Sequence, residues 1–265
     1  MTTSTTAPLS RDERNAYAQD GFVLLRERIP AERLARWSAR FEDLALDRVP
    51  TSGKMVVMKD VEVVKGGVKP ASPLHAINKL LSFEEDPILW EYAVDPHVLA
   101  AVRSIVGGAL HSISSNVFNK PPGVDGRHPL HQDLRYFALR PAEKIVATWT
   151  ALDRCTRENG CLAVVPGSHR GGLGWHGAPD WEHVNSGFFA LEEIDVDARV
   201  HVEMEPGDLL LFHPLLIHGS GRNRSDGFRR AISTHYASAE CERPEQPRKR
   251  PPVMRFIDSA EGRSA

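Results

Sequence analysis

The spacing of apolar and polar positions changes near residue 109 and divides the chain into two regions. In the first region, apolar residues recur three or four positions apart over 30–46, which places them on one face of an amphipathic helix. Two short apolar runs, 22–25 (FVLL) and 54–64 (KMVVMKDVEVV), are instead typical of strands. The apolar positions that predict the helix are Leu34, Trp37, Phe41 and Leu44.

Capping signals mark further helix ends in this first region. Ser10 and Glu13 stand three apart, as in a capping box, and Gly21 follows where a short helix would end. The Asp-Pro pairs at 86–87 and 95–96 each suit an N-cap followed by the first helical position. The first hundred residues are therefore predicted to supply several helices.

Beyond residue 109, short β-branched or aromatic runs alternate with turns rich in Gly, Pro and Asp. This texture predicts an antiparallel β-structure that is closed or sandwiched. We expect the helices of the first region to cover one face of it. The runs are 109–118, 144–152, 161–166, 199–204, 208–218 and 229–238.

The length of 265 residues and the absence of internal repeats predict a single domain over 1–265. Within it, we expect 1–9 to be a disordered tail and 10–108 to be a helical buttress. The β core is predicted over 109–240. The segment 241–265, rich in proline and charge, is predicted to be a surface extension.

Composition excludes several classes of partner. The chain is 41% hydrophobic, and its formal net charge is −2. With so small a net charge, the protein has no overall electrostatic field that attracts nucleic acid or an anionic membrane. No run approaches the roughly 20 apolar residues of a membrane-spanning helix, and no signal peptide pattern begins the chain. Cys155, Cys161 and Cys241 lack disulfide or zinc-site spacing and are expected to be reduced, with Cys161 buried. We therefore expect a cytoplasmic protein without nucleic-acid, integral-membrane or obligatory protein partners.

The stretch RHPLHQDLRYF (127–137) raises the question of a metal site. If HQD lies on or at the end of a strand, His131 and Asp133 share a face while Gln132 points away. A third ligand must come from elsewhere, and FHPLLIHGSG supplies His218 on a later predicted strand. Two imidazoles and one carboxylate leave three positions of an octahedron open, which is the facial triad of non-haem Fe(II) oxygenases.

A co-substrate such as 2-oxoglutarate would chelate iron through its keto acid end. Its far carboxylate would need a cation, and the guanidinium of an arginine matches a carboxylate better than the ammonium of a lysine does. After His218 the chain turns and returns through RRAIS, which brings Arg229 or Arg230 beside it. Alternation places Arg229 on the same face as Ser233 and His235. Arg230 lies on the opposite face, and the pattern alone leaves open which face is inward.

Other histidines compete for the metal. His128 stands close before His131 and is interpreted as a structural turn residue. His213 lies an odd number of positions from His218, so it should face away from it and pack. His169, in PGSHRGG, is expected to order a loop.

Several longer blocks resemble the phytanoyl-CoA dioxygenase family of Fe(II)- and 2-oxoglutarate-dependent oxygenases. They are NKPPGVDGRHPLHQDLRYFALRP, IVATWTAL, NGCLAVVPGSHRG and PGDLLLFHPLLIHGSGRNRSDGFRRAISTHYASAEC, which together span most of 116–241. The last block is long and far more specific than a bare His-x-Asp. The resemblance implies a fold that is mainly β with flanking helices: a double-stranded β-helix (jelly-roll, cupin-like) core buttressed by N-terminal helices.

Carried over residue by residue, the resemblance assigns two sets of residues and marks one departure. Asn116 stands where a close relative in the family has a methionine, and no contact is assigned to it. The implied iron ligands are His131, Asp133 and His218. The implied 2-oxoglutarate contacts are Lys79, Gln132, Trp149, Ser220 and Arg229, of which Arg229 pairs with the distal carboxylate.

The resemblance also implies the reaction. It is hydroxylation with Fe(II), 2-oxoglutarate and O₂, and with ascorbate as a reductant, at the 2-position of a methyl-branched fatty acyl-CoA such as phytanoyl-CoA. Asp133 favours hydroxylation, because relatives that halogenate lack this carboxylate. Two alternatives stay open: the same chemistry on a natural product or small polar metabolite, and a non-oxidative metal-binding cupin or sensor. The basic run at 246–250 is a candidate for the phosphates of coenzyme A, although a solvated tail is the simpler interpretation.

Overall fold

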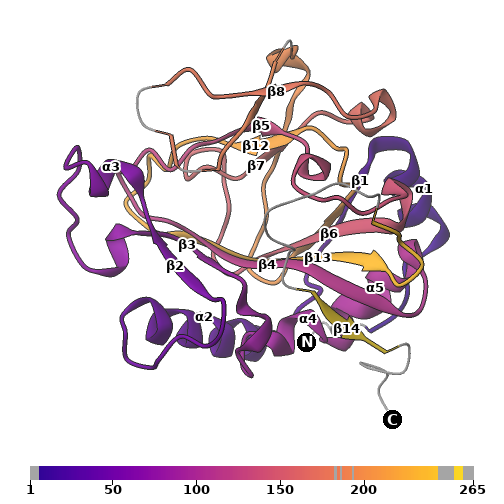
Figure 1. Ribbon diagram of the computed structural model, residues 1–265, viewed down its shortest axis with the longest axis horizontal. Coiled ribbons are helices and arrows are strands. Elements are labelled where there is room, and N and C mark those ends of the chain that lie inside the picture. Colours follow the sequence, from indigo (N-terminus) through magenta and orange to yellow (C-terminus); the bar gives the residue numbers. More distant parts are fainter. Residues whose placement is uncertain (1–5, 182–183, 186, 193, 244–253, 259–265) are drawn as a thin grey trace.

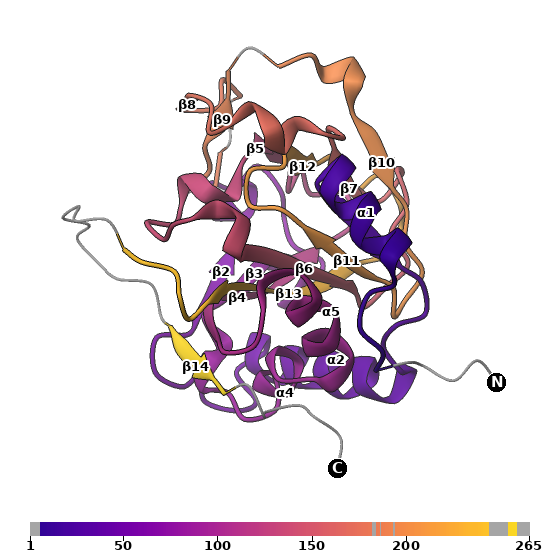
Figure 2. The ribbon, with the colours of Figure 1, turned by 90° about the vertical axis from the view of Figure 1, so that its right-hand side faces the viewer.

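The computed structural model describes residues 6–181, 184–185, 187–192, 194–243 and 254–258, and its centre is a pair of antiparallel sheets (Figure 1). Helices cover the outer face of the larger sheet, and the smaller sheet lies over the other face (Figure 2). This arrangement confirms the predicted mainly β fold with flanking helices.

The larger sheet has eight strands within the described residues. In chain order they are β1 (Phe22–Leu25), β2 (Val56–Lys59), β3 (Ile77–Leu81), β4 (Leu110–Lys120), β6 (Ile145–Ala151), β11 (Leu209–Phe212), β13 (Arg229–Ser238) and β14 (Arg255–Ile257). Their order in space is β1-β11-β6-β13-β4-β3-β2, and β14 pairs with β4. The interior strand β6 is buried along its whole length, as expected where both faces of a sheet are covered. β1, β2 and β3 come from the first hundred residues, so that region extends the sheet as well as covering it.

The smaller sheet is built from β5 (His128–His131), β7 (Leu162–Val164), β10 (Val200–Val202) and β12 (His218–Ser220). Their order is β10-β7-β12-β5, so β12 lies between β7 and β5. β8 (His176–Gly177) and β9 (Ala190–Leu191) form a separate two-stranded sheet at the top of the view in Figure 1.

The helices α2 (Ala31–Ala45), α4 (Trp90–Ala93) and α5 (Pro96–Val106) pack on the outer face of the larger sheet (Figure 2). The predicted apolar face of α2 is confirmed, because Trp37 and Phe41 are almost completely buried in the core. Burial of each such side chain contributes about 1.5–3 kcal/mol. This outer face is therefore an apolar core, and most of the polar chemistry lies elsewhere.

The predicted helix ends are confirmed at both α1 (Arg11–Asp20) and α5. The Ser10 side chain accepts from the Glu13 N–H and the Glu13 carboxylate accepts from the Ser10 N–H, which completes the capping box. Gly21 ends α1 in the left-handed conformation with a φ of 81°. At α5, the Asp95 side chain accepts from the His97 N–H.

The strand predicted over 54–64 is only partly correct. β2 ends at Lys59, and the next residues form the short helix α3 (Val61–Val64). The reason is local: the Asp60 side chain accepts from the Glu62 N–H and caps that helix, which draws the backbone away from a strand ladder.

Both chain ends contribute more to the fold than the sequence predicted. Positions 1–5 lie outside the described residues, but Leu9 is buried and its N–H donates to Ser104. In the predicted C-terminal extension, β14 pairs with β4 and Ile257 is fully buried. The basic run at 246–250 lies outside the described residues. Apolar residues in otherwise polar tails, such as Leu9 and Ile257, were the sequence feature that could have predicted this packing.

Candidate metal centre and pocket

The structure brings His131, Asp133 and His218 together. His131 ends β5, Asp133 begins the short 3-10 helix Asp133–Arg135, and His218 begins β12. Because β12 pairs with β5, His218 lies directly opposite His131. One possible ligand atom from each of the three buried residues lies within 4.8 Å of the others.

Gly219 allows β12 to approach β5 this closely. A Cβ atom at this position would lie 2.8 Å from the carbonyl oxygen of His128 and 2.9 Å from that of Pro129. Any side chain here would therefore push the two strands apart. The glycine that follows His218 is thus part of the reason that the two histidines meet.

Backbone hydrogen bonds fix the orientation of both imidazoles. Nδ1 of His131 lies 2.8 Å from the carbonyl oxygen of Pro129. Nδ1 of His218 lies 3.0 Å from the carbonyl oxygen of Leu216. A carbonyl oxygen only accepts, so each Nδ1 donates and each Nε2 is left to face Asp133. Nε2 of His131 lies 3.2 Å from Oδ1 of Asp133, and Nε2 of His218 lies 3.6 Å from Oδ2.

The electrostatics of this cluster favour a bound cation. Burial lowers the pKa of His218 to about 4, so its imidazole is neutral near pH 7 and offers a lone pair. Burial alone would raise the pKa of Asp133, but the imidazoles of His218 and His235 and the hydrogen bonds around the carboxylate lower it well below the usual range. An ionised carboxylate and imidazole lone pairs at these distances repel one another unless a proton or a metal ion lies between them.

The donor set fits iron. Two imidazole nitrogens and one carboxylate suit Fe(II), whereas structural zinc sites are often rich in thiolate. Cys155 and Cys161 are free and buried, and burial raises the pKa of their thiols to about 12 and about 11. In the described part of the chain no cysteine joins the cluster. Three protein donors leave coordination positions for small ligands.

A cavity of about 330 Å³ lies beside the cluster, with walls from both sheets. Much of its wall is apolar or aromatic, as is common in sites that bind small molecules. These wall residues are Met58, Leu81, Phe118, Tyr136, Phe137, Trp149, Leu162, Phe188 and Phe212.

Arg229 brings a buried positive charge to the same cavity. It is 2% exposed, its Nε has no hydrogen-bond partner among the described residues, and its guanidinium lies 5.4 Å from the ring centroid of Trp149. Lys120, directly opposite on β4, is also buried and lines the cavity. Burial and the nearby Arg229 lower the pKa of Lys120 well below its usual value. Two basic groups placed this close destabilise each other, so this part of the cavity favours an anion.

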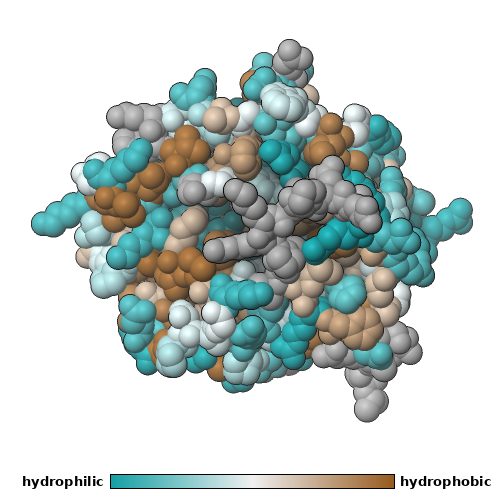
Figure 3. Space-filling view, viewed as in Figure 1, coloured by the Kyte–Doolittle hydropathy of each residue, from teal (hydrophilic) through white to brown (hydrophobic). Residues whose placement is uncertain are grey.

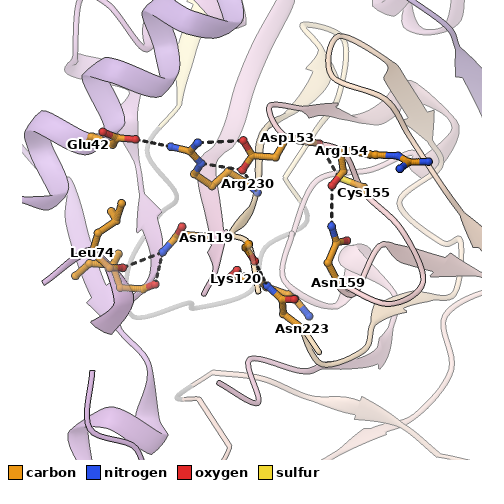
Figure 4. Close-up of polar contacts among 12 residues, drawn as sticks. Glu42, Leu74, Asn119, Lys120, Asp153, Arg154, Cys155, Asn159, Asn223 and Arg230 are labelled. Carbon is orange, nitrogen blue, oxygen red and sulfur yellow. Dashed lines mark hydrogen bonds and ion pairs between the residues drawn. The ribbon is translucent and has the colours of Figure 1, made fainter. Parts of the chain in front are cut away.

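Arg230 has a different role, which resolves the ambiguity left by the sequence. Figure 4 shows its guanidinium between Asp153 and Glu42. Its Nε lies 2.8 Å from Asp153 and its Nη1 lies 2.6 Å from Glu42, on α2. Arg230 therefore ties helix α2 to the sheet from the outer face, while Arg229 faces inward.

Three further residues of the predicted 2-oxoglutarate set line the cavity: Lys79, Trp149 and Ser220. Lys79 lies on β3, and its Nζ is 4.6 Å from the ring centroid of Phe118. Burial lowers the pKa of Lys79 to about 8, so it is still mostly a cation at neutral pH. Asn116 also lines the cavity, and its Nδ2 donates to Ser114.

Gln132, a predicted co-substrate contact, is not among the residues that line the cavity. Its Nε2 donates to the carbonyl oxygens of Gly172 and Leu215, and its Oε1 accepts from the Gly174 N–H. These bonds use both hydrogens of Nε2 and hold the amide on the opposite side from Asp133, as strand alternation predicts. Gln132 instead ties the metal-binding segment to the loop before β8.

The competing histidines do not join the cluster. His128 lies on β5 and lines the cavity, with its ring centroid 4.1 Å from that of Phe188, so it is a wall residue rather than a turn residue. His213 faces away, as predicted, and its Nδ1 accepts from the Leu215 N–H. His169 packs against His213 with ring centroids 5.2 Å apart.

Sequence reasoning did not assign a role to several polar residues of this cavity, of which His235 and Lys120 lie beside predicted site residues. His235 lies 2.7 Å from Asp133, measured from Nε2 to Oδ2, and lines the cavity with Arg229. Lys120 stands opposite Arg229 on β4. Alternation along β13 already placed His235 on the same face as Arg229, so its position near the site could have been predicted from the sequence. The pairing of β4 with β13 was not readable from the sequence.

Comparison with known proteins places the chain in a family. The family model described as "Phytanoyl-CoA dioxygenase (PhyH)" matches residues 17–231. This chain belongs to the phytanoyl-CoA dioxygenase family. The family predicted from the motifs is thereby confirmed, and with it the class of non-haem iron dioxygenases.

Two relatives show how far the similarity to phytanoyl-CoA dioxygenases extends. The chain is 44% identical over 238 residues to the "Probable phytanoyl-CoA dioxygenase" of Caenorhabditis elegans, which covers 87% of this chain and 76% of the worm protein. It is 41% identical over 238 residues to the human "Phytanoyl-CoA dioxygenase, peroxisomal", which covers 88% of this chain and 70% of the human protein.

Two solved structures share the fold of this phytanoyl-CoA dioxygenase family member. EctD from S. alaskensis in its apoform matches with a TM-score of 0.68 and 20% identity, over 88% of this chain and 78% of EctD. The epimerase SnoN in complex with Fe³⁺, alpha ketoglutarate and nogalamycin RO matches with a TM-score of 0.65 and 21% identity, over 88% and 85% of the two chains. Within the described residues, no helix is long and apolar enough to cross a membrane.

Proposed function

We propose that this member of the phytanoyl-CoA dioxygenase family is an Fe(II)- and 2-oxoglutarate-dependent dioxygenase that hydroxylates an unactivated C–H bond. One observation carries the proposal: a single cavity joins the buried His-Asp-His cluster to Arg229, a buried arginine with no ion-pair partner in the described part of the chain. A non-oxidative metal-binding cupin has no need for such an arginine.

In this proposal His131, Asp133 and His218 hold the iron through two Nε2 atoms and a carboxylate. Bound there, Fe(II) and 2-oxoglutarate supply the oxidation of a C–H bond by O₂, with succinate and CO₂ as co-products. The protein supplies orientation, because the carbonyl oxygens of Pro129 and Leu216 hold both rings in the tautomer that presents Nε2.

Arg229 is proposed to bind the distal carboxylate of 2-oxoglutarate. A guanidinium matches the two oxygens of a carboxylate, and the bound anion would relieve its unfavourable proximity to Lys120. Trp149 forms the wall beside the guanidinium, and Lys79 and Ser220 add a cation and a hydroxyl to the same cavity. The Gln132 contact is not part of the proposal, because its amide is used elsewhere.

The substrate is proposed to be a fatty acyl-CoA, methyl-branched and hydroxylated at its 2-position. The names of the sequence relatives and the apolar wall formed by Phe118, Phe137 and Phe188 support an acyl chain in the cavity. On the face shown in Figure 3, apolar side chains gather in the left half, over the region of α3, β2 and β3. Such a surface near the cavity suits an apolar substrate.

Anaerobic addition of Fe(II) and then 2-oxoglutarate tests the proposal. A visible charge-transfer band should appear only when both are present, and ascorbate should help to keep the iron reduced. The Arg229→Gln variant should need much more 2-oxoglutarate for the same band, whereas Arg154→Gln, on the surface, should not. A protein that binds iron but never forms the band would support the non-oxidative alternative.

A succinate-release screen identifies the substrate. Branched and straight acyl-CoAs, the corresponding free acids and small polar metabolites should be compared at equal concentration. Succinate release that responds to branched acyl-CoAs supports the proposed substrate. A response only to polar metabolites would keep the chemistry and replace the substrate. The cytoplasmic location stays a prediction, since the names of several relatives include "peroxisomal".

A further inference from the structure

His235 makes a buried contact that the proposed ligand set does not include. It lies on β13 and reaches from the larger sheet to Asp133, which follows β5 of the smaller sheet. Its Nε2 lies 2.7 Å from Oδ2 of Asp133, and both residues are 7% exposed. The contact therefore links the two sheets at the candidate metal site.

The two oxygens of Asp133 have different surroundings. Oδ2 lies 2.7 Å from Nε2 of His235 and 3.6 Å from Nε2 of His218. Oδ1 lies 3.2 Å from Nε2 of His131. An ionised carboxylate can only accept, so His235 donates its Nε2–H to Oδ2. Oδ1, beside Nε2 of the predicted ligand His131, is the oxygen offered to a metal ion.

The rest of the His235 ring makes apolar contacts. Its centroid lies 4.9 Å from that of Phe137 and 6.3 Å from that of Phe212. Its Nδ1 has no hydrogen-bond partner among the described residues. A phenylalanine or leucine would fill this apolar site without leaving a buried nitrogen unpaired. The bond to Asp133 is therefore the polar interaction that an imidazole provides here and an apolar side chain does not.

We infer that His235 is a positioning residue that holds Asp133 as a one-oxygen ligand of the metal. The inference rests on the proposed function and deepens it. Without the donor, Asp133 could turn and bind the ion with both oxygens, and would then occupy a position that the co-substrate or O₂ needs. Groups that bind a metal ligand from behind commonly change metal affinity about 10- to 100-fold when they are removed.

Two substitutions separate the hydrogen bond from the ring. His235→Phe keeps a flat ring against Phe137 and removes the donor, whereas His235→Gln loses the ring but can place an amide N–H near the original Nε2. A matched control is His111→Phe, on β4, where the ring packs against Phe256 and lies outside the cavity.

The test uses the full chain with Co(II), whose visible spectrum reports its coordination. Under nitrogen, His235→Phe should bind Co(II) about 10- to 100-fold more weakly and show an altered spectrum. His235→Gln should stay within about threefold of the unmodified protein, which is about 0.7 kcal/mol. His111→Phe should match the unmodified protein in both readouts. Thermal unfolding of each metal-free variant shows whether it is folded.

Two results would overturn the inference. One is a folded His235→Phe variant that binds Co(II) with unchanged affinity and spectrum. The other is a His235→Gln variant that loses as much affinity as His235→Phe, because the ring shape would then matter and not the donor. If the unmodified protein bound no Co(II), the proposed function would fail as well, so the two failures can be told apart.

A measurement on the unmodified protein does not depend on how the variants fold. With Zn(II) as a diamagnetic substitute, nitrogen NMR of labelled histidine should show a hydrogen on Nε2 of His235 that is retained when the metal is bound. Resonance assignment comes from the loss of the signal in His235→Gln. An Nε2 without hydrogen in the metal-bound protein would contradict the inference.

Discussion

Two neighbouring arginines of β13 point to opposite faces of the larger sheet and have opposite surroundings. Arg230, on the outer face, is bonded to Asp153 and Glu42. Arg229, on the inner face, is buried without an ion-pair partner among the residues that the structure describes. The difference indicates that polar groups with protein partners hold the fold, whereas those without one are available to a ligand.

The same contrast extends along the two faces. On the outer face, the Tyr236 hydroxyl donates to the carbonyl oxygen of Ala93, and the Tyr92 hydroxyl bonds to Thr148 and Thr150. On the inner face, Nε of Arg229 and Nδ1 of His235 lack partners within the described ranges. The polar groups of the outer face connect helices to the sheet, while those of the inner face surround a cavity.

Removing the carboxylate of the inner face should have the largest effect. Asp133→Ala should lower succinate formation to the level of a protein-free control, because the cluster loses its only anionic donor. The measurement is succinate release with Fe(II), 2-oxoglutarate and a substrate from the screen. Asp43→Ala, at a surface carboxylate paired with Arg48, should keep full activity. Substantial succinate release by Asp133→Ala would show that another residue completes the site.

Removing the inner arginine should affect co-substrate binding and not folding. Arg229→Gln should raise the 2-oxoglutarate concentration for half-maximal rate by about 10- to 100-fold, since a hydrogen bond to a charged group contributes about 1.5–3 kcal/mol. The melting temperature of the metal-free protein should be unchanged or higher, because a buried cation without a partner is removed. An unchanged 2-oxoglutarate requirement would refute the role of Arg229.

Removing the outer arginine should affect the stability of the fold and not the binding of the co-substrate. Arg230→Gln should lower the free energy of unfolding by about 1–3 kcal/mol, because it leaves Asp153 and Glu42 without their half-buried cation. Its 2-oxoglutarate requirement should match that of the unmodified protein. Urea unfolding and initial rates measure the two quantities. If both arginine variants changed the same quantity, the contrast between the two faces would be wrong.

The sequence predicted much of the candidate site because its residues lie in short, regular patterns. His131 and Asp133 are two apart at the end of a strand, and Arg229 shares a face of β13 with His235, so alternation grouped each pair on one face. It did not show which face of β13 is inward. The helix ends at Ser10 and Asp95 were readable because capping depends on neighbouring residues alone.

What the sequence did not predict depends on contacts between distant segments. The position of Lys120 opposite Arg229 follows from the register of β4 against β13, which local patterns do not encode. The sequence made two opposing predictions for Gln132. Strand alternation predicted that its side chain points away from His131 and Asp133, whereas the family resemblance implied a contact with 2-oxoglutarate. Alternation was correct, because three backbone groups in other segments bind its amide.

Glu84 departs from the pattern of the two faces, because it is buried outside the cavity and has no ion-pair partner in the described segments. Burial raises the pKa of its carboxyl to about 7. Because this folded-state value lies above that of an exposed glutamate, the protonated form is favoured by folding. The contribution of the Glu84 carboxyl to the free energy of unfolding is complete below about pH 4, and it is lost as the pH rises through about 7.

Glu84→Gln should therefore have a small effect that depends on pH. The variant keeps a neutral side chain of similar shape, so near pH 5 its stability should be close to that of the unmodified protein. At pH 8 it should be more stable by about 1–2 kcal/mol, because it avoids an ionised buried carboxylate. Urea unfolding at both pH values measures the difference, with the exposed Glu143→Gln as the matched control. A gain that is the same at both pH values would show that ionisation of Glu84 is not the cause.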